Sequence, residues 1–225
     1  MSHLLHTPRR RRHLQRGLSL VELMVGIAIG LFIVAAASML TTSHLDDNRR
    51  LMLETQVQQE LRAAADIVAR DLRRAGYWSA AQEGVSTPEH PTPTDNPNTA
   101  LSTAPGESSD DMRFAYTITD TNSAAGFRFD QANGVAEIKL GPGNYQPLTD
   151  PQLVSITAFD VVLRQTEVSL AAMCVTPCVE PACPKQLQRR YEFQIAGTAT
   201  HDASVRRSLS GQVRLPNDII TGACP

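Results

Sequence analysis

The feature that most constrains this chain is an apolar run of 23 residues, 18–40, that follows an arginine-rich start. As an α-helix the run would rise about 35 Å, enough to cross the hydrocarbon core of a bilayer. Its only charged side chain is Glu22. A carboxylate at membrane depth costs roughly 2.5–3.5 kcal/mol by insertion scales, and less near the interface. Glu22 is therefore a candidate functional residue, and its partner must be sought.

The sequence before Glu22 supplies a partner. Positions 9–12 and 16 are arginine, and the positive-inside rule places them in the cytoplasm. A cut between Gly17 and Leu18 would create an α-amino group close to the Glu22 carboxylate. The segment resembles the class III signal of type IV prepilins, in which a dedicated inner-membrane peptidase cuts after the glycine and methylates the new amino terminus. The resemblance implies that Leu18 becomes N-methylated and that Glu22 neutralises an amino terminus during filament assembly.

Two other interpretations of this segment remain open. A cleaved secretory signal would use Ala35-Ala36-Ala37 before Ser38 as its cut site. The apolar run is longer than such a signal needs, however, and Glu22 would have no purpose there. A plain membrane anchor is the second alternative, and a prepilin is itself such an anchor before assembly.

Charge and cysteine content limit the function classes. The chain has 225 residues and a net charge of −2, which becomes −7 without the five arginines of residues 1–17. This acidic balance argues against a general nucleic-acid binder. If the helix is oriented as argued, the cysteines face an oxidising periplasm and should form disulfides. A disulfide bond between the last cysteine and one of the other three would anchor the C-terminal tail, but the pairing stays open. Zinc is disfavoured because the spacings lack C-x2-C. The four cysteines are Cys174, Cys178, Cys183 and Cys224.

The helix is expected to continue beyond the apolar run. Apolar residues recur at steps of three and four and predict one buried stripe. Arg73 and Arg74 suit the negative end of a helix dipole, and Gly76 is a natural residue just past a helix end. One helix from about Leu18 to Ala75 would be about 87 Å long. The stripe consists of Leu53, Val57, Leu61, Ala64, Ala65, Val68, Leu72 and Ala75.

The remainder divides into a loop and a strand-rich region. Five prolines between positions 88 and 105 predict a surface-exposed loop over 79–111 without regular structure over most of its length. Alternating patterns then predict antiparallel strands, and Asn133-Gly134 predicts a hairpin. The fold class is therefore α+β, a long N-terminal helix with a sheet covering its amphipathic half. The expected strands centre on 113–118, 127–130, 136–140, 153–165, 188–200 and 205–216.

This plan resembles the type IV pilin fold throughout, and residues 69–78 (Ala-Arg-Asp-Leu-Arg-Arg-Ala-Gly-Tyr-Trp) resemble the helix end of PilW-type minor pilins. Minor pseudopilins of type II secretion share the leader and a similar Arg-Asp-Leu-Arg stretch and are the alternative. Two departures stand out. Leu18 replaces the usual phenylalanine, and residues 18–78 lack the proline common in the membrane half of major pilins. The predicted divisions are a leader (1–17), a transmembrane or filament-core helix (18–40), an amphipathic helix (41–78), a loop (79–111) and a disulfide-bonded β-sheet domain (112–225).

The resemblance implies a structural protein, not an enzyme, that is made as a single-pass inner-membrane precursor and passes into the pilus. The implied partners are prepilin peptidase, other minor pilins, major pilin subunits and the inner-membrane assembly platform. A role in initiating pilus assembly follows, with twitching motility, adhesion and DNA uptake as the associated processes. The second alternative is a simple membrane-anchored periplasmic binding domain.

Other chemistry finds little support in the sequence. No G-x-S-x-G or H-E-x-x-H motif occurs, and His201-Asp202 near Ser204 is interpreted as a solvated turn. Arg189-Arg190 and Arg206-Arg207 could lie together on paired strands as a small basic patch of the kind that contacts DNA phosphates, but we favour an exposed, partly ion-paired sheet face over a DNA contact. The acidic residues near 110–122 do not form a full calcium-loop signature. We assign no metal and no cofactor.

Overall fold

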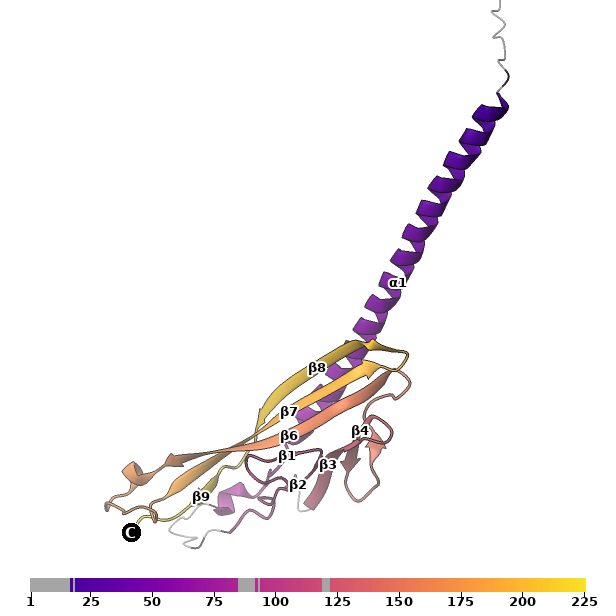
Figure 1. Cartoon of the computed structure of the whole chain (residues 1–225). Helices are drawn as coiled ribbons and strands as arrows, with labels where there is room; N and C mark the ends of the chain where they lie inside the picture. Colours follow the sequence, from indigo (N-terminus) through magenta and orange to yellow (C-terminus); the bar gives the residue numbers. More distant parts are fainter. Residues whose placement is uncertain (1–16, 18, 85–91, 93, 119–121) are drawn as a thin grey trace, which may run out of the picture. The chain divides into compact units, whose positions relative to one another are not determined.

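The computed structural model describes residues 17, 19–84, 92, 94–118 and 122–225. The chain divides into two compact units, residues 1–49 and 50–225. Helix α1 (Leu20–Leu72) contributes residues to both units (Figure 1). Two short 3-10 helices, η1 (Ala81–Gly84) and η2 (Ala171–Met173), occur in the second unit. The strands are β1 (Ser108–Ser109), β2 (Asp111–Thr117), β3 (Asn122–Asp130), β4 (Val135–Leu140), β5 (Gln146–Pro147), β6 (Val154–Ser169), β7 (Lys185–Ala199), β8 (Asp202–Arg214) and β9 (Ile219–Thr221).

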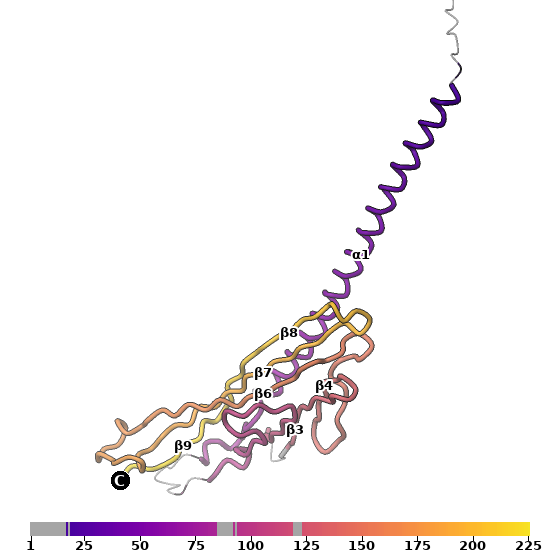
Figure 2. The backbone as a smooth tube through the Cα atoms, viewed as in Figure 1, coloured from indigo at the N-terminus to yellow at the C-terminus, as the bar shows by residue number. Residues whose placement is uncertain are grey.

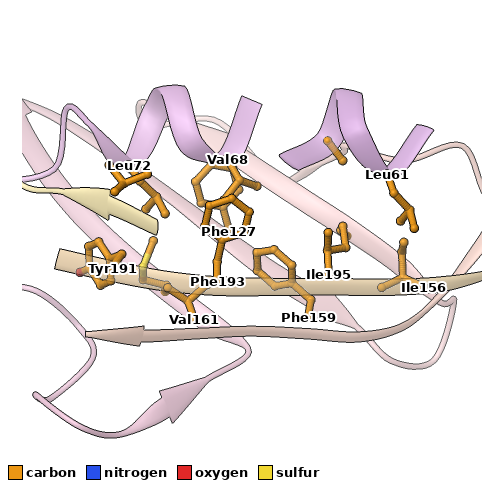
Figure 3. Packing of buried hydrophobic residues seen from close by; sticks show 14 of the residues in the cluster. Leu61, Val68, Leu72, Phe127, Ile156, Phe159, Val161, Tyr191, Phe193 and Ile195 are labelled. Atoms are coloured by element: carbon orange, nitrogen blue, oxygen red, sulfur yellow. The ribbon is translucent and has the colours of Figure 1, made fainter. Parts of the chain in front are cut away.

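The predicted apolar stripe forms one side of the core of the second unit. Figure 3 shows Leu61, Val68 and Leu72 pointing from α1 toward the aromatic and aliphatic side chains of the strands. Each of these three leucine and valine side chains is fully buried. At about 25 cal/mol per Å² of apolar surface removed from water, each contributes roughly 1.5–3 kcal/mol. Val57, Ala64 and Ala75 are also buried, and Leu53 and Ala65 pack against the cluster at its margin.

The strands form two antiparallel sheets rather than the single sheet expected. One has the order β1-β6-β7-β8, with β9 pairing the start of β7, and the other has the order β2-β3-β4-β5. Figure 2 shows β6 and β7 side by side as a long hairpin, in agreement with their register from Val154–Ala199 to Ser169–Lys185. The two sheets share one core because Phe127 of β3 packs on Phe159 of β6, with ring centroids 6.4 Å apart. The α+β class is confirmed, and so is the turn at Gly134, whose φ is +62°.

The regular part of α1 ends at Leu72, three residues before the predicted end. Arg74 and Ala75 donate their backbone N–H groups to the carbonyls three residues back, Asp71 and Leu72, which tightens the last turn. Gly76 has a φ of +74°, as expected for a residue just past a helix. Its N–H bonds to the Ala115 carbonyl of β2 at 3.0 Å. The Ala115 carbonyl therefore accepts the Gly76 N–H, which would bond to a carbonyl of the helix itself if the helix continued.

The loop over 79–111 is more firmly attached than its composition indicates. Residues 85–91 and 93 lie outside the described residues. Within the described part, Asn98 is fully buried and donates from Nδ2 to the Tyr77 carbonyl and to Thr117 Oγ1, both at 2.8 Å. Thr103 is buried as well. The expectation of an exposed loop is therefore wrong for these positions. A loop segment can be buried when its polar side chains are hydrogen-bonded, as the Asn98 side-chain amide is here.

Candidate functional site

The amino-terminal unit presents an exposed apolar helix. Its first hydrogen bond runs from the Leu23 N–H to the Ser19 carbonyl at 3.0 Å. Glu22 lies in the first turn, where a carboxylate suits the positive end of the helix dipole. Large apolar side chains are exposed all along this stretch, with Phe32 78% and Leu20 73% accessible. Soluble monomers rarely expose so long an apolar surface, so this part of α1 needs lipid or other helices around it.

Length and composition make α1 a helix that can cross a membrane, and it is the one such helix in the described part of the chain. Three hydroxyl residues near the end of the apolar run bond back to their own helix. Ser38 donates to the Val34 carbonyl, Thr41 to Ala37 and Thr42 to Met39, at 2.8–2.9 Å. Hydroxyls satisfied in this way do not require water.

The proposed cleavage site is only partly described. Gly17 and Glu22 lie in the described residues, whereas Leu18 and residues 1–16 lie outside them. Cleavage between Gly17 and Leu18 and N-methylation of Leu18 therefore stay predictions. So does the role of the arginine-rich leader.

The four cysteines form two disulfides at the connection between β6 and β7, residues 170–184. Cys174 pairs with Cys224 and Cys178 with Cys183, with Cα–Cα distances of 5.4 and 5.3 Å. The first bond attaches the C-terminal tail to the hairpin, and the second closes a short loop. As disulfides, these sulfurs carry no thiolate for zinc.

At the end of α1, around the Arg-Asp-Leu-Arg stretch, the buried Asp71 lies near two exposed arginines, Arg70 and Arg74. Asp71 is only 2% exposed, and its Oδ1 lies 3.6 Å from Arg70 Nε and 3.7 Å from Arg74 Nη1. The Arg74 guanidinium also lies over the Tyr116 ring at 5.9 Å. Trp78 forms a bridge with Thr117 at the start of the following loop. This stretch therefore joins the helix end to the four-stranded sheet.

The predicted basic patch does not form. In the β7–β8 register, Arg190 lies opposite Arg214, whereas Arg206 and Arg207 lie opposite Thr198 and Gly197. At about 3.4 Å per residue, eight positions along a strand are roughly 27 Å. The prediction was wrong because it assumed proximity without knowing the register of a long hairpin.

Arg189 differs from the prediction in another way, because it points into the molecule and is 4% exposed. Its Nη1 donates to the Thr99 carbonyl at 3.0 Å, and burial lowers the pKa of its guanidinium. Its Nη2 would lie 3.4 Å from a Cβ at Gly76, an ordinary van der Waals distance, so the positive φ of Gly76 and not this contact favours glycine there. The signal was present in the sequence, since Arg189 shares the strand face of Tyr191 and Phe193.

Two further groups of residues stand out in the sequence, the turn at 201–204 and the acidic residues near 110–122. His201 is exposed at the turn between β7 and β8, and Ser204 Oγ donates to Asp202 Oδ1 at 2.7 Å. Asp110 accepts from Gln131 Nε2 at 3.2 Å, and Asp120 lies outside the described residues. Among the residues that are described, no group of three or more His, Cys, Asp or Glu side chains is placed to hold a metal ion.

Comparison with known proteins agrees with this geometry. The model of the prokaryotic N-terminal methylation motif matches residues 12–38, which include Gly17, Leu18 and Glu22. The family model described as prepilin peptidase-dependent protein B matches residues 50–215, nearly the whole of the second unit. No curated protein and no solved structure gives a significant match. The chain is thus a type IV prepilin-like protein and belongs to the prepilin peptidase-dependent protein B family.

Proposed function

We propose that this protein is a minor pilin that helps to initiate type IV pilus assembly after cleavage between Gly17 and Leu18. The observation that carries the proposal is the exposed apolar helix with one carboxylate, Glu22, in its first turn. The family match supports processing by prepilin peptidase. In the proposed division, residues 1–17 are the leader, 18–40 the filament core, 41–78 the amphipathic helix with the turns that follow Leu72, 79–111 a loop and 112–225 the periplasmic sheet domain.

Glu22 acts in this proposal by discriminating docked from misaligned helices. After cleavage, the Leu18 amine of one subunit carries a positive charge in a low-dielectric environment. A neighbouring Glu22 neutralises it when the helices are in register, and a misaligned helix leaves a costly unpaired charge. No bond is made or broken in this step, so the function is structural and needs no cofactor. The partners are prepilin peptidase, other minor and major pilins and the assembly platform of the inner membrane.

The first test replaces Glu22 by glutamine, which keeps the size of the side chain and removes its charge. Membrane insertion and cleavage should be preserved, whereas recovery of the subunit in sheared filaments should fall by at least about tenfold. Leaving a Leu18 amine without its carboxylate partner at membrane depth costs ~2.5 kcal/mol, which corresponds to more than a tenfold loss. Asp46→Asn is the matched control, because Asp46 is exposed on the same helix beyond the apolar run. Normal recovery of the Glu22→Gln subunit would refute the assembly role.

The second test is the intact mass and N-terminal sequence of the protein extracted from membranes, with and without prepilin peptidase. The proposal requires a chain that begins at N-methylated Leu18 and disappears without the peptidase. A chain beginning at Ser38 would indicate a secreted domain, and an uncut chain would indicate a plain anchor. Loss of pili in the deletion strain, with type II secretion intact, would assign the protein to the pilus and not to a pseudopilus.

A further inference from the structure

Strand β8 forms one free edge of the five-stranded sheet. It is the last strand in the order β1-β6-β7-β8 and pairs only with β7 among the described residues. The N–H of Leu215, just past the strand, bonds to the Arg189 carbonyl at 3.0 Å. Because hydrogen-bonded pairs alternate in an antiparallel ladder, positions 207, 209, 211 and 213 bond to β7. The backbone groups of the even-numbered residues therefore point outward, away from the sheet. The Arg206 carbonyl accepts from Arg207 Nη1 at 2.8 Å, so the edge offered to another strand runs from Ser208 to Arg214.

The side chains of these same even-numbered residues lie on the exposed face of the sheet and form a regular pattern. Arginine stands at both ends and small or neutral polar residues lie between them, all exposed and none acidic. Natural edges usually carry charges, prolines or bulges that prevent pairing, and the middle of this edge has none of these. Antiparallel pairing with a second copy, centred on Ser210, would place Arg206 opposite Arg214, and like charges oppose that contact. The outward residues are Arg206, Ser208, Ser210, Gln212 and Arg214.

A depression of about 300 Å³ lies on the outer face beside this edge. Arg190 and Arg214 line it together with the donor-bearing side chains of Thr166, Gln188 and Gln212, and no carboxylate does. The buried residues Arg189 and Val213 complete the lining. The two arginines are direct cross-strand partners of the non-hydrogen-bonded kind, in which Cα atoms are about 4.5 Å apart.

Such a like-charge pair destabilises a sheet. Each guanidinium has one acidic neighbour outside the depression. Arg190 Nε donates to Glu192 at 3.2 Å and Arg214 Nη2 to Asp218 at 2.6 Å. Both guanidinium groups have further N–H donors, which a carboxylate entering the depression could engage.

We propose that the β8 edge binds an extended segment of a second protein that carries acidic side chains at alternate positions. The segment adds a strand to the sheet, and one of its carboxylates enters the depression between Arg190 and Arg214. Main-chain hydrogen bonds supply affinity in this mode and the side-chain pocket supplies specificity. Nucleic acid fits less well, because the exposed arginines here already have acidic neighbours: Glu192 lies against Arg164 and Arg190, and Asp218 against Arg214. The fourth arginine, Arg189, is only 4% exposed.

The test uses full-length protein in detergent and a fluorescent nine-residue peptide in which glutamate alternates with valine. Residues directly opposite each other share a face, so the glutamates lie opposite the outward positions of β8 and their own N–H groups bond to it. N-methylation of the glutamate amides should abolish binding, whereas N-methylation of the valine amides should change the Kd less than about twofold. Replacing the glutamates by glutamine should weaken binding by about tenfold or more.

Protein variants test the same contact from the other side. Arg190→Gln and Arg214→Gln should each weaken peptide binding by about tenfold, and thermal unfolding should confirm that both remain folded. Arg113→Gln is the matched control, because Arg113 is an exposed arginine of the other sheet. Absence of peptide binding, equal binding of both methylated peptides or insensitivity to the arginine variants would each overturn the proposal. So would a 20-base-pair DNA duplex that competes at the same two arginines. None of these measurements requires filament assembly, so their failure is distinct from failure of the pilin function.

Discussion

Glu54 of helix α1 and Arg207 of strand β8 form an ion pair across 153 residues of sequence. Arg207 is one of the inward-facing residues of the edge strand, and Glu54 lies one turn before the fully buried Val57. Arg50 also donates to Glu54, at 3.3 Å. The pair fixes the helix against the last strand of the sheet, at a position where the apolar core begins.

Replacing Glu54 by glutamine should lower the free energy of unfolding by about 1 kcal/mol, because a partly exposed charged hydrogen bond is lost while its volume is kept. Urea unfolding measures this change. Asp66→Asn, an exposed substitution on the same helix, should change stability by less than about 0.5 kcal/mol. The difference between the two variants should shrink in 1 M salt, since the contact is electrostatic. Equal effects of both substitutions would show that the contact adds nothing.

Local patterns predicted the elements of this fold well. The stripe from Val57 to Ala75 follows from helical periodicity, and the turn at Gly134 follows from the Asn-Gly pair, because both depend on residues near one another in sequence. Gly17 and Glu22 were singled out because a glycine before an apolar run that contains one carboxylate is unusual, and their roles stay predictions.

Register and long-range pairing could not be predicted in the same way. The separation of Arg190 from Arg206 depends on where the β7–β8 hairpin turns, and the Glu54–Arg207 pair joins distant segments. The strand alternation indicates which face Arg189 occupies, but not its partner, the Thr99 carbonyl, because the sequence does not place the 79–111 loop against β7. The pairing of Cys174 with Cys224 and of Cys178 with Cys183 could not be predicted for the same reason, because sequence alone does not fix which segments meet.

Gly211 is required by the ring of Phe193 on the neighbouring strand. The two residues are register partners, and a Cβ at position 211 would lie 2.4 Å from the ring. Gly211→Ala should therefore destabilise the protein by about 1–3 kcal/mol through overpacking. Gly143→Ala is the matched control, because the nearest atom to a Cβ there is 3.9 Å away. Restoration of stability by Phe193→Leu in the Gly211→Ala background would identify the clash as the cause, and a fully stable Gly211→Ala protein would contradict it.

The two disulfides should contribute unequally to stability. Cys174 and Cys224 are 50 residues apart in sequence, whereas Cys178 and Cys183 are 5 apart. Loop-closure entropy then gives about 4 kcal/mol for the first bond and about 2 kcal/mol for the second. Urea unfolding of the Cys174→Ser, Cys224→Ser double variant and of the Cys178→Ser, Cys183→Ser double variant compares them. A larger loss from the short-range pair would contradict this order.

Tyr191 should make the protein sensitive to alkaline pH. Burial raises the pKa of its phenol, and the nearby Arg189 guanidinium offsets part of that rise. A raised pKa in the folded state means that its contribution is complete below about pH 10, where an unfolded tyrosine is still protonated. Above that pH the unfolded chain loses the proton first, so stability falls as pH increases.

Tyr191→Phe should reduce this alkaline loss and leave stability near pH 7 within about 0.5 kcal/mol, because the buried hydroxyl has no hydrogen-bond partner among the described residues. Chemical unfolding between pH 7 and pH 11 measures the slope for each variant. Tyr77→Phe serves as the control, since Tyr77 is 40% exposed. An unchanged slope in Tyr191→Phe would exclude this phenol as the titrating group. A large loss at pH 7 would instead mean that the hydroxyl is bonded, and the contact with Arg189 would then be the first to test, with Arg189→Met in the Tyr191→Phe background.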